Sequence, residues 1–161
     1  DQFSAHPVPG NQPSAATGPN GALVVMDLYG AVELLPEPSS AESYGMACTA
    51  SAPHLLASEL PDLGQSSFAL EVTQATANGL IAIGAGHQSL NVSVFGCDLL
   101  VASITTSLLV ADSQGYVAAP LPLPLNTALL GSEYFFQAAM LDGTAPNGLT
   151  FSRGLKITLG E

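Results

Sequence analysis

Positive charge is almost absent from this chain of 161 residues. Arg153 and Lys156 are the only lysine or arginine side chains, against 13 acidic ones, and the formal net charge is −11. Nucleic acids and anionic membrane surfaces are bound through clusters of Lys and Arg. The composition therefore argues against nucleic acid as a partner, and equally against phosphorylated substrates.

Long apolar runs are missing as well. No stretch approaches the roughly 20 consecutive apolar residues that a membrane-spanning helix needs, so we expect no membrane span. With 47% hydrophobic and 9% charged residues, the chain is nevertheless too apolar to be disordered, because it can bury enough surface to offset its chain entropy. Its length suits one domain with an appendage.

Cysteine is scarce too, since Cys48 and Cys97 are the only two and lie 49 positions apart. No Cys-x-x-Cys pair and no nearby pair of histidines suggests zinc. Two free buried thiols remain an alternative, but low Lys content and abundant Ser, Thr, Gly and Pro are typical of extracytoplasmic proteins, where disulfides form. Because the sequence begins at Asp1 without Met or an apolar leader, we expect a mature secreted chain with a disulfide.

The N-terminal third divides into an arm, a strand and a linker. Residues 1–21 hold four Pro and three Gly, which predicts an extended arm. In residues 22–35 every even position is apolar or glycine, and this period-two alternation predicts one long strand with one buried face. Residues 36–43 are expected to be a linker. The face in question comprises Val24, Met26, Leu28, Gly30, Val32 and Leu34.

Residues 44–161 are predicted to form the body, an all-β domain. Short apolar runs with Gly-rich turns between them favour an antiparallel β-sandwich of the jelly-roll or immunoglobulin-like kind, with the N-terminal strand and arm extending from it. The segments NG, GAG, DSQG and DGTAPNG supply turn residues. Only residues 126–131 look helical, with Asn126 as N-cap and Gly131 as the stop. Strands are expected at 67–73, 79–83, 97–103, 105–110, 116–121, 134–141 and 149–159.

Several motifs of the body together resemble a known module. They are YGMAC at 44–48, LPDLG at 60–64 followed by FALEV, GC at 96–97, LPLPLNTALLGSEYFFQAAMLD at 121–142 and APNGLTFSRGLKITLG at 145–160. This combination is similar to an all-β module that recurs, often C-terminally, in secreted proteins of planctomycete-type bacteria. The resemblance implies an extracellular domain with a cysteine pair at Cys48 and Cys97 and no enzymatic activity. Residues 1–43 have no counterpart in it.

The sequence contains no constellation that would carry catalysis. His6, His54 and His87 lie in separate contexts, and no GxSxG motif is present. We therefore expect no enzyme, no cofactor and no metal site. The turns that begin at Asp112 and Asp142 resemble oxygen-rich calcium loops, but ordinary turns are the more economical interpretation. Asn91-Val-Ser is a formal glycosylation sequon.

The possible functions differ in what the N-terminal strand pairs with. If residues 22–35 pair with the sheet of a neighbouring copy, they act as a donor strand, and such a head-to-tail joint propagates as a fibre. A strand or hairpin within its own sheet, and a swapped dimer or ring, are the alternatives. We expect the first: an extracellular structural subunit whose partner is itself, in a filament or surface appendage.

A secreted module that binds glycans or cell surfaces is the competing function. Sugar sites usually rely on exposed aromatic faces, and this chain is only 6% aromatic with no Trp, which weakens that reading. The candidate platforms would be its four tyrosines, Tyr29, Tyr44, Tyr116 and Tyr134.

Overall fold

The structure, a computed structural model, comprises two compact units, Asp1–Glu37 and Pro38–Glu161. It describes residues 38–94, 96–143, 145 and 147–161, together with the backbone of three strands in the N-terminal unit. The second unit is the body, and it begins at Pro38 rather than at Tyr44.

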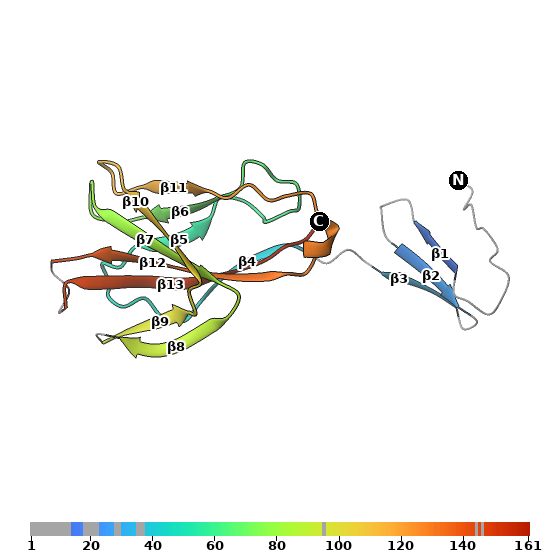
Figure 1. The fold of residues 1–161 in the computed structure, drawn as a ribbon, viewed down its shortest axis with the longest axis horizontal. Helices are drawn as coiled ribbons and strands as arrows, with labels where there is room; N and C mark the ends of the chain where they lie inside the picture. The colour runs from blue at the N-terminus through green and yellow to red at the C-terminus, as the bar shows by residue number, and fades with distance from the viewer. Residues whose placement is uncertain are drawn as a thin grey trace. The chain divides into compact units, whose positions relative to one another are not determined.

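The N-terminal unit contains one antiparallel sheet in the order β1-β2-β3 (Figure 1). Its strands are β1 (Ser14–Thr17), β2 (Leu23–Asp27) and β3 (Gly30–Leu34). The range predicted as one long strand, 22–35, thus contains two strands that pair with each other. Alternation of apolar residues continues through both strands, so the pattern alone does not distinguish them from one strand.

The pairing of β2 with β3 divides the predicted face. Met26 lies opposite Ala31, and Val25 lies opposite Val32. Because residues opposite each other in an antiparallel pair share a face, even positions of β2 share a face with odd positions of β3. In this sheet the alternate set therefore occupies both faces, and Leu28, a member of that set, lies outside the described residues.

The body is all-β with antiparallel sheets, as the sequence predicted. Its largest sheet has five strands in the order β10-β7-β12-β13-β4, a second has the order β11-β6-β5, and β8 and β9 form a hairpin. The strands are β4 (Ser40–Tyr44), β5 (His54–Ala57), β6 (Ala69–Thr73), β7 (Leu80–Gly86), β8 (Ser89–Val94), β9 (Cys97–Val101), β10 (Thr105–Val110), β11 (Val117–Pro120), β12 (Glu133–Leu141) and β13 (Leu149–Thr158). A single turn of 3-10 helix, Thr127–Leu129, is capped by the Asn126 side chain.

The five-stranded and three-stranded sheets share one hydrophobic core. Alternate residues of β12, namely Phe136, Ala138 and Met140, face Leu70 and Val72 of β6 across it. Phe68, Val72, Ile81 and Ala138 are completely buried there. Burial of these side chains supplies the main stabilisation of the body, at about 25 cal/mol per Å² of apolar surface removed from water.

Three strands of the body were not predicted from the sequence. Residues 40–43, assigned to the linker, form β4 together with Tyr44, and β5 and β8 were not expected either. The middle three residues of β4 are exposed, and β8 is exposed at most positions. Strand β4 has no apolar alternation to recognise, so backbone pairing alone defines it. In β8, by contrast, Leu90, Val92 and Val94 alternate with polar residues, a period-two signal that the prediction missed.

The GAG segment was predicted to be a turn, but it lies at the end of β7. The connection from β9 to β10 passes closely over this point, where Ala102 N donates to Gln88 O and Ile104 N donates to Ala85 O. A Cβ atom on Gly86 would overlap the carbonyl of Ala102. Glycine is required here for close approach of two backbones.

We therefore predict that Gly86→Ala lowers the free energy of unfolding by about 1 to 3 kcal/mol, the usual range for overpacking. Gly143→Ala is the matched control, because a Cβ atom there meets nothing within 4 Å. Urea unfolding of both variants measures the difference. Equal stability of the two would show that the crossing has room for a methyl group.

Candidate interaction surface

The β8–β9 hairpin covers part of the outer face of the five-stranded sheet, and Gln137 fastens it there. Gln137 Nε2 donates to Asp98 O at 2.9 Å and to Ser152 O at 3.0 Å. Its Oε1 accepts from Leu100 N at 2.9 Å. The side chain is buried, so each of these bonds replaces one to water, and together they fix β9 on β12 and β13.

Tyr44 makes a second attachment from edge strand β4. Its hydroxyl donates to Leu100 O at 2.7 Å, and its ring meets that of Phe135 edge-on at 5.8 Å. The ring lies over Gly154, where a Cβ atom would overlap it. Partial burial raises the pKa of Tyr44 to about 12, because the phenolate is less well solvated than in water.

A disulfide between Cys48 and Cys97 is the third attachment, and it confirms the predicted pairing. It joins the segment after β4 to the first residue of β9. All three attachments hold the same hairpin, and none of them involves β10.

Strand β10 is an edge of the five-stranded sheet, with β7 as its strand partner in the described part of the chain. Its sequence, TTSLLV, contains neither charge nor proline. Leu108 is 65% exposed and Val110 is 62% exposed. Natural edge strands usually carry charges, proline or bulges that prevent further pairing, and β10 has none of these.

The other edges of the two larger sheets are better protected. Strand β4 carries Glu42 and polar neighbours. Strands β5 and β11 have only four residues each, and β11 ends at Pro120. Short length, charge and proline all discourage addition of a further strand. Among the edges of these two sheets, as far as the structure describes them, β10 is therefore best suited to accept one.

An apolar strip continues from β10 across the outer face of the sheet. The register places Val110 opposite Leu80 and Leu108 opposite Ala82, which in turn lies opposite Ala139. Leu80 is 46% exposed. Beside this strip, a cavity of about 190 Å³ separates the sheet from β9 and is lined by Gly84, Leu99 and Phe151 among others. The hairpin thus leaves apolar surface uncovered on the side of β10.

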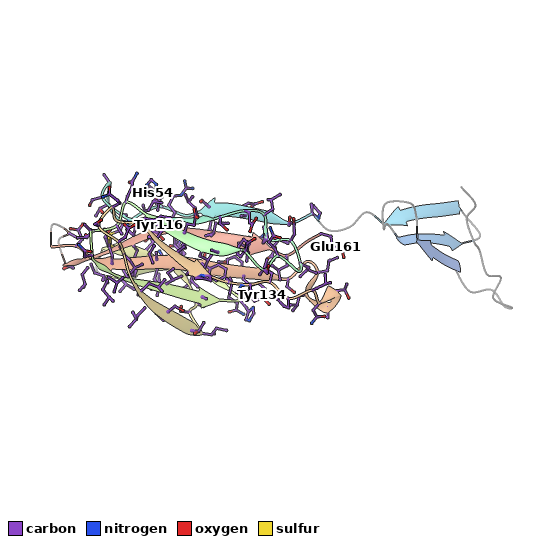
Figure 2. The ribbon with its side chains drawn as sticks, turned by 90° about the horizontal axis from the view of Figure 1, so that it is seen from above. His54, Tyr116, Tyr134 and Glu161 are labelled. Atoms are coloured by element: carbon purple, nitrogen blue, oxygen red, sulfur yellow. A yellow bond between two sulfur atoms is a disulfide. The ribbon has the colours of Figure 1, made fainter. Side chains whose placement is uncertain are left out.

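The titratable residues named from the sequence do not gather into a site. His54 and Tyr134 lie well apart in the body (Figure 2). His87 packs on Tyr134, with 4.8 Å between the ring centroids. Among the described residues, no group of three His, Cys, Asp or Glu side chains could hold a metal ion. His6 lies outside those residues.

The two aspartate turns have structural roles. Asp112 Oδ1 accepts from Gln114 N at 2.7 Å and from Tyr116 N at 2.9 Å, as in an ordinary Asx turn. Asp142 is buried and accepts from Ser51 Oγ at 3.1 Å. Asn91 of the sequon is exposed on β8.

Of the four tyrosines, Tyr44 and Tyr134 are partly buried, and Tyr29 lies outside the described residues. Tyr116 is 38% exposed, and its hydroxyl donates to Glu71 Oε1 at 2.9 Å. This bond raises the pKa of Tyr116.

The residues proposed to join subunits are only partly described. Val24 and Met26 belong to β2, whereas Gly30, Val32 and Leu34 belong to β3. No helix of the described residues is long and apolar enough to cross a membrane. Comparison with protein-family models, curated proteins and solved structures finds no match for this chain. The resemblance to the planctomycete-type module therefore stays an expectation.

Removing the disulfide should destabilise the body. The bond closes a loop of 49 positions, so the chain-entropy model gives a loss of about 4 kcal/mol for the Cys48→Ser, Cys97→Ser double variant. Urea unfolding measures it, and the intact mass of the unreduced wild type should show no alkylatable thiol. Two reactive thiols would contradict the pairing.

Tyr44 should make stability sensitive to alkaline pH. Its pKa is higher in the folded chain than the ordinary 10, so its contribution is complete below pH 10 and is lost as the pH rises through about 12. Wild type should therefore lose stability more steeply than Tyr44→Phe over this range, as followed by urea unfolding. Identical slopes would mean that the Tyr44 hydroxyl is well solvated.

Proposed function

We propose that this protein is an extracellular structural subunit that polymerises through its N-terminal strand region into a filament or surface appendage. The observation that carries the proposal is the coexistence of an unprotected edge strand in the body with an N-terminal unit whose described strands form one three-stranded sheet. One copy then offers both a strand and a place that accepts a strand.

The N-terminal sheet is poorly suited to stand alone. Leu23, Val24, Val25 and Met26 follow one another in β2, so large apolar residues occupy both of its faces. A single sheet of three short strands buries neither face by itself, and isolated small sheets are marginal in water. We expect such a sheet to gain stability from a partner layer or strand.

The connection within residues 22–35 also favours exchange. Only Leu28 and Tyr29 separate β2 from β3 in the sequence. Two-residue hairpin turns favour Asn-Gly, Asp-Gly or Gly-x, because one or both positions require positive φ. Leu-Tyr is a poor choice for such a turn, and an extended donor strand would avoid the conflict while restoring one continuous apolar face.

The compartment and architecture fit this assignment. A disulfide and a chain with two Lys or Arg residues are consistent with a secreted protein. We also infer that the body belongs to the antiparallel sandwich class, in a jelly-roll or immunoglobulin-like form, because two sheets share its core. Such domains are common subunits of extracellular assemblies.

Binding of a glycan or cell surface is the second candidate. The observation in its favour is Tyr116, an exposed ring held by Glu71 on the outer face of the three-stranded sheet. A sugar platform usually needs further aromatic or polar groups directed at the same ring. Tyr44 and Tyr134 do not supply them, since both engage in packing within the body.

The substitution Leu28→Asp distinguishes a donor strand from a hairpin. In a donor strand Leu28 lies at the centre of the buried face, and burying an unpaired carboxylate costs several kcal/mol, so assembly should be lost. In a hairpin the same residue would fall in the turn, where Asp is well tolerated. Sedimentation and electron microscopy of the variant follow the outcome.

Tyr29→Asp is the matched control, because it adds the same charge one position away on the opposite face. We expect it to assemble nearly as wild type does. Failure of Tyr29→Asp with normal assembly of Leu28→Asp would show that the strand faces the other way. Filaments from both variants would exclude this segment as the joint, and wild type without filaments would overturn the proposed function.

A further inference from the structure

We infer that the free edge of β10 accepts residues 22–35 of a second copy of this chain. This inference rests on the proposed function and locates the other half of its joint. The acceptor edge comprises Thr105–Val110 of β10 together with Leu80, which extends its outer face. The occupant is a strand rather than a helix or small molecule, because what β10 leaves unpaired is one side of a strand backbone.

The donor segment is long enough to cover the acceptor edge. Thr105 O already accepts from Ser103 Oγ at 3.1 Å, which leaves residues 106–110 for pairing. Residues 22–35 exceed this length, so pairing centred on Leu28 would cover all five positions. Side chains on one face of the added strand would continue the row of Thr106, Leu108 and Val110, which alternate on the outer face with the same period of two.

The charge distribution permits a copy of this chain to approach β10. Two molecules that each carry −11 repel one another wherever acidic groups meet. Strands β7 and β10 contain no charged residue. The cations offer little attraction elsewhere, because Lys156 pairs with Glu133 at 2.6 Å and Arg153 Nε donates to Gly45 O.

Chain connectivity favours a second copy over the molecule's own strand. Strand β4 lies at the opposite edge of the five-stranded sheet from β10, four strand positions away. A strand added beyond β10 would lie about 24 Å from β4 at the usual strand spacing. The stretch from Leu34 to Ser40 spans at most about 21 Å when fully extended. A donor strand ending at Leu34 therefore does not reach its own acceptor edge.

The test combines an acceptor variant with a donor variant in the full-length chain. Leu108→Glu places a charge on the acceptor edge, at a side chain already 65% exposed, so folding should be preserved. Leu125→Glu is the matched control, because it adds the same charge at a side chain 82% exposed in a loop. We expect Leu108→Glu to raise the concentration required for assembly by at least about a hundredfold and Leu125→Glu to leave it nearly unchanged.

Mixing provides the decisive measurement. Leu108→Glu retains a working donor strand, and Leu28→Asp retains a working acceptor edge. Each alone should sediment as a monomer with the melting temperature of the wild-type body, whereas an equimolar mixture should form a one-to-one dimer and stop. This complementation requires one donor and one acceptor located on different elements.

Each other outcome overturns a defined part of the inference. Filaments from Leu108→Glu like those from Leu125→Glu would place the acceptor elsewhere while leaving polymerisation intact. A mixture that stays monomeric would exclude a joint between these two elements. If wild type stays monomeric and both Leu108→Glu and Leu28→Asp lower the melting temperature, the strand pairs within its own molecule. If wild type stays monomeric and neither variant lowers the melting temperature, the proposed function is wrong.

Discussion

The central strand β12 must be covered on both faces, and the rest of the body follows from this constraint. Phe136, Ala138 and Met140 face the core shared with the three-stranded sheet, while Gln137 and Ala139 face the other way. A second layer is therefore needed outside the sheet, and the β8–β9 hairpin provides it. Gln137, Tyr44 and the disulfide all serve to hold that hairpin in place.

Placing the hairpin outside the sheet determines where β10 lies. The chain leaves β9 in the outer layer and must return to the five-stranded sheet, which it does by crossing over the end of β7. Gly84 and Gly86 allow this crossing, because a side chain at either would collide with residues 102–103. The chain then forms β10, which pairs with β7 at the edge of the sheet. An unpaired edge at β10 is thus a consequence of how the outer layer is built.

How much of this was predictable depends on how clearly the sequence of each strand is marked by apolar residues. Apolar residues identify strands β6, β12 and β13 in the sequence. Strand β10 was predicted with its observed bounds, Thr105–Val110. That β10 is an edge was not predictable, since it depends on the order of strands that are distant in sequence. Residues 40–43 of β4 were assigned to the linker and the glycines of β7 to a turn, because linkers and turns are rich in the same residue types. The disulfide was predicted from composition and compartment. The structure shows that it attaches β9 to the segment after β4.

A strongly acidic chain that associates with itself faces a physical conflict that the distribution of charge resolves. Thirteen carboxylates keep copies apart across most of the surface, which protects a protein rich in apolar strands from indiscriminate aggregation. Salt screens this repulsion between charges more than about 8 to 10 Å apart, so it acts mainly at short range. Strands β7 and β10 carry no charge, so repulsion there is weak, and apolar side chains are exposed on them. Acidity elsewhere and neutrality at β10 therefore act together, the first suppressing random contacts and the second permitting the approach of a second copy at this edge.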